Sequence, residues 1–431
     1  MTRWRATASL GRAALVATAA ATFAVLLGDP VLVVLAGPLA LCAALGFVHT
    51  TRSRPRLDVV LDHSVLHEGQ GTTSRLQVTG ADAVEHVARV SGRAAYLALH
   101  PADGVVGTLW DPQRGLDLEL GPRRWGQYRP AEEKVALTAA WGGWRWGPVP
   151  LTATSLRVLP GRAPFDSRAE MPQPVGLVGA HRSRRTGTGS EFAGVRPFHV
   201  GDRLQRVSWR VSLRTGELHV VSTRSEEDSA VLLVVDALGD HGRSGGVDGE
   251  ASSLDLAVRA AAAVARHVGR AGDRVGLRVL GPTAGVVGYG SGALHQQRVL
   301  TTLAGIRPGR AADDDADRIR LPVTPGTVVV VFSPMLDDRV STMTATLTRR
   351  GLPTVVVDTL PGTAAEAGSD ERGHPSIDAL AWRMRLVERD LLLADVAAHG
   401  CPVVPWRGPG TLDRVLRGFS GSVRAPRAGA R

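Results

Sequence analysis

The hydrophobic pattern of the chain begins with two apolar stretches that carry no charge. They cover Ala13–Leu27 and Pro30–Val48, with a Gly-Asp-Pro turn between them. The second is close to the roughly 20 residues that span a bilayer, and the first reaches that length when Arg12 lies at the interface. The pattern predicts a transmembrane helical hairpin within residues 1–55. A signal peptide is the alternative for the first stretch, but the second stretch that follows at once favours the hairpin.

Arginines on both sides of the hairpin indicate its orientation. Asp29 is the charged residue at its tip, whereas its flanks carry Arg3, Arg5, Arg12, Arg52, Arg54 and Arg56. Because basic residues favour the cytoplasmic side, we expect a multi-pass protein of the cell's inner (cytoplasmic) membrane with both termini in the cytoplasm. Residues 13–48 would lie in the lipid bilayer. The two cysteines, Cys42 and Cys401, make no disulfide framework, which agrees with that compartment.

Residues 56–160 contain short segments in which apolar and polar residues alternate. Leu57–Leu61 and Ser74–Val78 alternate in part, and a Glu-Gly-Gln-Gly turn lies between them. Similar segments follow at Gly104–Trp110, Leu116–Leu120, Lys134–Ala140 and Ser155–Leu159. Several short strands at this spacing predict a small antiparallel β-sandwich. We expect a loop packed over this sandwich, rather than a ligand-stacking site, at Trp141, Trp144 and Trp146.

The remaining pattern divides into a linker and an α/β domain. Residues 161–190 are rich in Pro, Gly, Arg and Ser, which predicts a linker that opens the segment 161–229. Strand patterns then alternate with helical ones: strands at Ala230–Val235, Arg274–Leu280, Thr327–Phe332, Pro353–Asp358 and Pro402–Val404, and helices at Ser253–Val268, Leu294–Leu303, Ile377–Ala398 and Leu412–Phe419. This alternation predicts a doubly wound α/β domain over residues 230–423, followed by a tail over 424–431.

Ligands of such sheets bind at the carboxyl ends of the strands. The sequence therefore puts Asp236 and the segment Ser333–Asp338 at the expected functional edge of the α/β domain.

The net charge of +10 changes this picture little. Of the 51 Lys+Arg residues Lys134 is the single lysine, and the chain has no asparagine, a bias that GC-rich coding explains. The charge is scattered rather than gathered in one stripe, so we expect no nucleic-acid partner. The chain contains no Gly-Lys pair and no His-Glu-x-x-His, which excludes a Walker A phosphate loop and that type of zinc protease.

Two glycine-rich segments look like catalytic or nucleotide-binding motifs. Gly242–Gly246 matches the nucleophile elbow around Ser244, but it lacks the tight strand-to-helix turn that an elbow needs, so we predict a flexible loop. Gly288–Gly292 lacks the third glycine of a dinucleotide motif and does not open the first helix of the sheet, which predicts a turn.

Arginines are densest around one tryptophan. Four of them lie in residues 203–214 around Trp209, Gly216 ends this element, and Leu218–Val221 reads as a strand. Packed guanidinium groups need acceptors, for which the local candidates are Glu191, Asp202, Glu217, Glu226 and Glu227. We favour an internal ion-pair network that clamps two domains together. The alternative is a recognition surface for an acidic partner.

This block resembles the signature of the domain of unknown function 58 (DUF58) family. The match is carried by Gly189, Glu191, Phe192, Arg196, Gly201, Asp202, Arg206, Trp209, Ser212, Arg214 and Leu218, whereas Phe198, Val207 and Leu213 replace the family's tyrosine, isoleucine and alanine. The resemblance implies an N-terminal hairpin, a β-rich region and a C-terminal von Willebrand factor A-like domain. It also implies a partner or adaptor of MoxR-type AAA+ ATPases, in a family for which no catalytic activity is established.

A von Willebrand A-like domain usually binds Mg²⁺ through Asp-x-Ser-x-Ser after its first strand. This chain reads Asp-Ala-Leu-Gly-Asp from Asp236, so the resemblance carries over Asp236 alone, with Asp240, Asp337 or Asp338 as further carboxylates. We expect weak or absent metal binding and no cofactor. We favour the interpretation that Asp236 caps or pairs within the sheet edge.

These observations predict a non-enzymatic, membrane-anchored adaptor or scaffold, whose partner is a MoxR-type AAA+ ATPase. The alternative is a hydrolase or metal-dependent enzyme that uses Ser244 or an Asp236-centred site, although His241 is the single nearby base for Ser244. A purely structural envelope protein is a third hypothesis, and it has no nucleotide-dependent partner.

Overall fold

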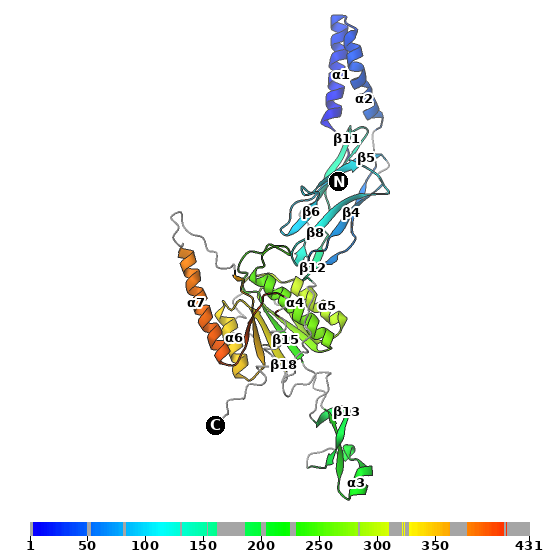
Figure 1. Ribbon diagram of the computed structural model, residues 1–431. Coiled ribbons are helices and arrows are strands. Elements are labelled where there is room, and N and C mark those ends of the chain that lie inside the picture. Colours follow the sequence, from blue (N-terminus) through cyan, green and yellow to red (C-terminus); the bar gives the residue numbers. More distant parts are fainter. Residues whose placement is uncertain are drawn as a thin grey trace. The chain divides into compact units, whose positions relative to one another are not determined.

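The computed structural model divides the chain into two compact units, Met1–Leu159 and Pro160–Arg431 (Figure 1). It describes residues 3–49, 53–80, 83–129, 132–152, 154–161, 186–199, 204–224, 230–282, 285–309, 321, 323, 327–362, 377–408 and 411. Most of the predicted linker, the predicted helix Leu412–Phe419 and the tail 424–431 lie outside the described residues.

The first unit begins with the predicted pair of apolar helices. Helix α1 covers Ala8–Leu27 and α2 covers Val31–Val48. The Thr7 hydroxyl accepts a hydrogen bond from the Leu10 amide at the start of α1, and Gly28 ends α1 in the left-handed conformation that glycine adopts without strain. Both helices are long and apolar enough to cross a membrane.

A two-residue strand joins this helix pair to the sheets that follow. Strand β1 (Arg5–Ala6) pairs with β11 (Trp144–Pro150), and the Thr7 amide donates to the Gly143 carbonyl at 2.9 Å. The indole Nε1 of Trp144 donates to the Gly46 carbonyl at 2.8 Å, near the end of α2. Both helices are therefore tied to the same end of the β-rich region.

The predicted tryptophan loop is partly wrong. Trp144 and Trp146 lie in strand β11, and Trp146 is buried in the core. Of the three, Trp141 lies in the turn before this strand, where its exposed ring meets His49 edge-on at 5.4 Å. The glycines around these residues had suggested a loop, but large apolar side chains also fill the inner face of a strand.

The described residues of the β-rich region form three sheets. The further strands are β2 (Arg56–Leu61), β3 (Val65–His67), β4 (Thr72–Thr79), β5 (Val84–Val90), β6 (Leu97–His100), β7 (Val105–Leu109), β8 (Leu116–Pro122), β9 (Gly126–Tyr128), β10 (Lys134–Ala139) and β12 (Leu156–Leu159). They form sheets of order β1-β11-β10-β5-β7, β2-β4-β8-β6 and β3-β12-β9. One core cluster combines Leu76 and Leu116 of the second sheet with Val87 and Leu137 of the first, which is the packing of a β-sandwich.

A buried arginine connects the two larger sheets. Arg89 of β5 is fully buried, and its guanidinium donates to Glu133 Oε2 at 2.7 Å. The same group reaches the other sheet at Ser74 of β4, where it donates to the backbone carbonyl at 2.8 Å and to Oγ at 2.6 Å. Every side of this charge is therefore held by an acceptor, which is the condition under which a buried ion pair is tolerated.

The second unit contains a small β-hairpin and an α/β region. Strands β13 (Thr186–Pro197) and β14 (His219–Arg224) pair in antiparallel fashion, and between them lie the 3₁₀ turn η1 (Leu204–Arg206) and helix α3 (Trp209–Thr215).

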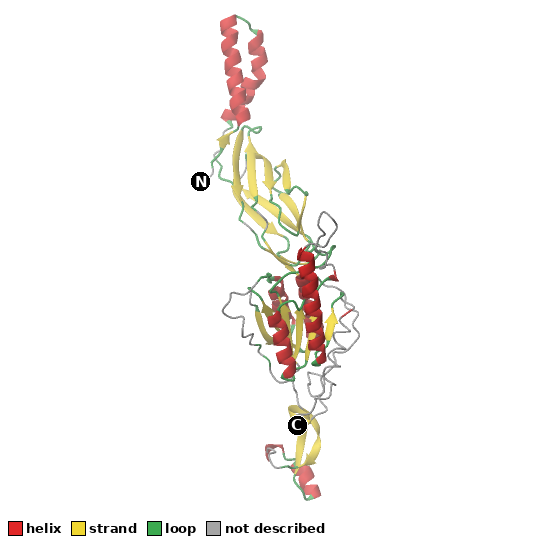
Figure 2. Cartoon of the chain, turned by 90° about the vertical axis from the view of Figure 1, so that its left-hand side faces the viewer, coloured by secondary structure: helices red, strands yellow, loops and turns green. Residues whose placement is uncertain are grey.

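In its described part, the α/β region contains a six-stranded sheet of order β17-β16-β15-β18-β19-β20, in which all neighbours are parallel except β17. Its elements are β15 (Ala230–Asp236), α4 (Ser253–Ala271), β16 (Arg274–Leu280), β17 (Val286–Gly290), α5 (Ala293–Ala304), β18 (Thr327–Ser333), α6 (Asp338–Arg349), β19 (Thr354–Asp358), α7 (Ile377–Ala398) and β20 (Val403–Pro405). Helices lie on both faces of this sheet, α4 and α5 on one and α6 and α7 on the other (Figures 1 and 2).

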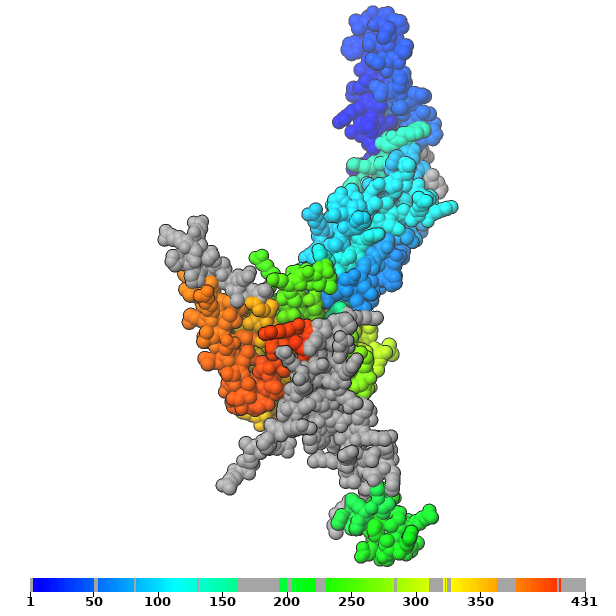
Figure 3. Space-filling view, viewed as in Figure 1, coloured from blue at the N-terminus to red at the C-terminus, as the bar shows by residue number. Residues whose placement is uncertain are grey.

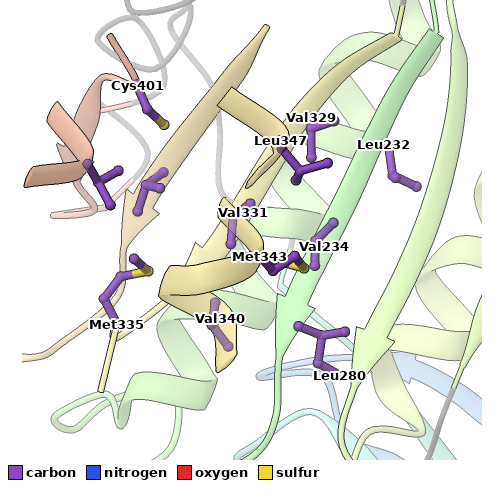
Figure 4. Packing of buried hydrophobic residues seen from close by; sticks show 12 residues of the cluster. Leu232, Val234, Leu280, Val329, Val331, Met335, Val340, Met343, Leu347 and Cys401 are labelled. Carbon is purple, nitrogen blue, oxygen red and sulfur yellow. The ribbon is translucent and has the colours of Figure 1, made fainter. Parts of the chain in front are cut away.

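The sheet core explains the valine-rich strands. Strands β15 and β18 are buried along their whole length, as expected for strands with helices on both faces. On the α6 side, Val234 and Val331 pack with Met343 and Leu347 (Figure 4). One expectation fails at the sheet edge, because residues 288–290 belong to β17 rather than to a turn.

Removing one partner of the buried Arg89 pair should unfold the sandwich more easily. In Glu133→Ala the guanidinium loses its carboxylate, and we expect a loss of about 3–5 kcal/mol in the free energy of unfolding. The measurement is calorimetry of the full chain in detergent. The matched control is Asp117→Ala, which breaks the exposed Arg75–Asp117 pair and should cost much less. Equal losses in the two variants would contradict a structural role for the buried pair.

Candidate functional site

The signature block is folded around one serine. Ser212 is buried, and its Oγ donates to the Ser208 carbonyl at 2.9 Å while it accepts from the His219 amide at 2.9 Å. This hydroxyl therefore ties α3 to the first residue of β14. Gly216 ends α3 in the left-handed conformation, as expected, and lets the chain turn back into that strand.

Exposed apolar side chains lie on α3 and in the segments beside it. Trp209 and Leu213 are four residues apart, hence on the same side of α3, and their side chains are 63% and 83% exposed. Leu204 of η1 and Leu218 beside β14 are exposed as well. We call Trp209 and Leu213 the α3 face. Large exposed apolar side chains that lie side by side mark a candidate contact surface, whereas single ones are normal on a monomer.

The predicted signature residues divide into described and undescribed ones. Arg214 is exposed in the last turn of α3, and Arg196 in β13 donates to the Pro197 carbonyl at 3.1 Å. The backbones of Glu191 and Phe192 lie in β13 and that of Arg206 lies in η1, but their side chains are outside the described part. Gly201 and Asp202 are outside the described residues, so the interdomain ion-pair network stays a prediction.

The carboxyl edge of the α/β sheet is the second candidate site. Asp236 ends β15 and is only 3% exposed. Its Oδ2 accepts from the Ser333 hydroxyl at 2.6 Å, and its Oδ1 accepts from the Leu238 amide at 3.0 Å. Burial raises the pKa of Asp236 to about 6, while these two hydrogen bonds work in the opposite direction.

The residues around Asp236 do not fit a bound Mg²⁺ ion. Leu238 and Asp240 stand where the metal motif has serines, and both oxygens of Asp236 already accept hydrogen bonds inside the protein. Asp240 Oδ1 accepts from the Leu254 amide at 3.1 Å, and Asp337 pairs with Arg339 at 3.2 Å. Within the described part of the chain, no group of three or more His, Cys, Asp or Glu side chains is placed to hold a metal.

Ser244 lacks the surroundings of a nucleophile. It lies in the loop between β15 and α4, where its Oγ accepts from the Gly246 amide at 3.3 Å. Among the described residues, no hydrogen bond joins it to His241, whose ring faces Trp382 of α7 at 5.8 Å. Burial also lowers the pKa of His241. The predicted loop is present, and its geometry does not assemble a serine and a base.

Helix α7 fastens the same edge, which sequence reasoning did not reveal. Arg389 is buried and forms an ion pair with Asp358, the last residue of β19. Its Nε donates to the Pro334 carbonyl at 2.6 Å, and Arg385 donates to the Leu336 carbonyl. The segment Ser333–Asp338 is therefore held from one side by Asp236 and from the other by α7. The sequence indicates that the strand ends at Asp358, but it does not reveal that Arg389 pairs with this aspartate.

Comparison with known proteins bears on the signature block and part of the α/β region. Residues 194–362 match a family model described as "Protein of unknown function DUF58", which confirms the resemblance over that range. The uncharacterized proteins Rv1480 of Mycobacterium tuberculosis and Mb1516 of Mycobacterium bovis are each 32% identical over 171 residues, covering 37% of this chain. The match covers 51% of each relative, so the chain spans about half the length of the curated relatives it matches.

The range matched by the family model contains Arg196, Trp209, Arg214 and Asp236, and it begins after Glu191 and Phe192.

The raised pKa of Asp236 makes stability depend on pH. Its pKa is about 6 in the folded chain against 3.8 ordinarily, so this group contributes stability at acidic pH that is lost as the pH rises through 6. The loss amounts to up to about 3 kcal/mol. We expect the free energy of unfolding to fall over this window in wild type and to change less in Asp236→Asn, as measured by thermal unfolding at a series of pH values. Parallel pH profiles would contradict the assignment.

Proposed function

We propose that this protein is a non-enzymatic, membrane-anchored adaptor or scaffold, and that the α3 face is where it binds its partner. The observation that carries the proposal is the exposure of Trp209 and Leu213 side by side on α3. Tryptophan is among the residues that contribute most to protein–protein binding, and a side chain of this size is usually buried in a monomer.

Two arginines beside the α3 face support a partner with an acidic surface. Arg210 and Arg214 are exposed on the same helix, four residues apart. Arginine next to tryptophan is the usual composition of an interface hot spot, and two guanidinium groups favour carboxylates opposite them. We propose an acidic surface of a MoxR-type AAA+ ATPase as the partner, which is the class that the DUF58 resemblance implies.

Anchoring is the second part of the proposal. Helices α1 and α2 are long and apolar enough to cross a bilayer, and most of their large apolar side chains face outward. We propose that they form a hairpin in the inner membrane with both termini in the cytoplasm, because arginines flank both ends and Asp29 is at the tip. The signature block would then face the compartment in which an ATPase works.

The α/β region is, in this proposal, a von Willebrand factor A-like scaffold without a metal. Its support is the strand order with one antiparallel edge strand, and an aspartate at the end of the first strand of the sheet. Because the oxygens of Asp236 accept hydrogen bonds from Ser333 and Leu238, this carboxylate is used for structure. Among the described residues no hydrogen bond joins Ser244 to a base, which supports an adaptor rather than a hydrolase.

Truncation of the α3 face should release the partner. In Trp209→Ala we expect recovery of the AAA+ ATPase to fall at least about tenfold, since hot-spot residues contribute this much or more. The measurement is quantitative co-purification of the full chain from detergent, with and without ATP. The control is Leu294→Ala, which removes another exposed large apolar side chain, on α5.

Equal recovery from wild type and Trp209→Ala would contradict the proposed site. Failure of wild type to recover any ATPase, in either nucleotide condition, would contradict the adaptor role and favour a structural envelope protein.

A further inference from the structure

Helix α7 exposes a continuous apolar stripe. The side chains of Ile377, Leu380, Met384, Val387 and Leu391 are between 48% and 85% exposed. They recur at intervals of three, four, three and four residues, which aligns them along one side of the helix. Figure 3 shows α7, in orange, at the surface of the α/β region.

The orientation of this stripe is fixed by the opposite side of the helix. Ala379, Arg389 and Val396 are buried, and Arg389 is held by Asp358 and by the Pro334 carbonyl. A rotation of α7 that buried the stripe would pull this charge out of its ion pair. The stripe therefore stays outward in the folded chain and needs a cover from elsewhere.

The spacing of the apolar residues along α7 indicates that a second helix packs against the stripe. Apolar residues at alternating intervals of three and four form the seam of a two-helix coiled coil, in which Ile377, Met384 and Leu391 take the a positions and Leu380 and Val387 the d positions. The continuation at Ala394 keeps the same register. A partner helix of the same register is available in a second copy of this chain.

Charged residues beside the seam favour one relative direction of the two paired helices. Arg383 and Asp390 are in g positions, and Glu388 and Asp395 are in e positions. In a parallel pair, Arg383 would meet Glu388 of the second copy, but Asp390 would meet Asp395 of the second copy and be repelled. In an antiparallel pair, Arg383 meets Asp390 of the second copy on both sides of the two-fold axis.

The charged side chains next to the seam are exposed. No carboxylate lies within ion-pair distance of Arg383 among the described residues, and its side chain is exposed. Asp390 is 75% exposed and lies 3.6 Å from the buried Arg389, which orients it without removing it from the surface. The acidic flank of Glu388, Asp390 and Asp395 also disfavours an anionic membrane surface as the cover.

We propose that the α7 helices of two copies pack antiparallel and join the chain into a dimer through its α/β region. In this register Met384 faces Val387 of the second copy and Leu380 faces Leu391 of the second copy. The inference does not depend on the proposed ATPase partner, because it uses another surface of the second unit.

Charge reversal in the full chain in detergent tests the pairing. Arg383→Asp and Asp390→Arg should each weaken self-association at least about tenfold, because each puts like charges together on both sides of the axis. Mixing the two variants should restore association, since the carboxylate introduced in one chain then meets the guanidinium introduced in the other. Analytical ultracentrifugation measures this, with Arg298→Asp on exposed α5 as the control of equal charge change. Unchanged association in the single variants, or a monomeric wild type, overturns the proposal.

Cysteine cross-linking tests the direction and is unaffected by contacts of the apolar hairpin. In a Cys42→Ala background, a chain with Leu380→Cys and a second chain with Leu391→Cys should form a disulfide when mixed and oxidised, and neither should cross-link by itself. Cross-linking of either variant with itself indicates a parallel pair and contradicts the proposal. Absence of cross-linking in the mixture, in a sample that sediments as a dimer, contradicts it equally.

Discussion

The arrangement of the α/β region depends on one guanidinium that is withdrawn from water. Arg389 reaches from α7 under the carboxyl end of the sheet to Asp358 and to the Pro334 carbonyl. A charge in this position is tolerated only with all its partners present, so α7 has one rotation and one height relative to the sheet. The fixed position of α7 explains why the segment Ser333–Asp338 is held against this helix. It also explains why the apolar stripe faces outward. Arg389 thus determines which side of α7 is buried against the sheet and which side is exposed to solvent.

At the carboxyl edge of the α/β sheet, the aspartate that ends β15 makes hydrogen bonds within the protein. Asp236 lies where ligands of such sheets bind, yet Ser333 and Leu238 use both of its oxygens. Apolar or acidic residues stand where hydroxyl ligands would be needed. The edge is consequently a structural joint between β15, β18 and α7. Exposed apolar side chains lie elsewhere, on α3 and along the outer side of α7.

The sequence was informative where burial alone decides the structure. Valine-rich strands such as β15 and β18 and the uncharged helices α1 and α2 follow from pattern, since every position obeys the same preference. It was misleading where context overrides composition. Helix α6 was missed because it is rich in threonine, yet Asp337 caps it and its hydroxyls donate to carbonyls one turn back. Strand β17 was missed because Gly288 and Gly290 suggested a turn. The Asp358–Arg389 pair spans 31 residues, and no local pattern reveals it.

The short strand β1 has a consequence for synthesis. Thr7 is hydrogen-bonded to Gly143, so the chain must be extended by 136 residues after Thr7 before this junction can close. The apolar helices leave the ribosome before β11 and can enter a bilayer while the edge of β11 does not yet exist. The pairing of β1 with β11 then comes late. It joins the newly completed β-rich region to helices that are already in the bilayer. Loss of β1 would expose the backbone of β11 at Trp144 and Arg145, and an unpaired strand edge is a template for pairing with other chains.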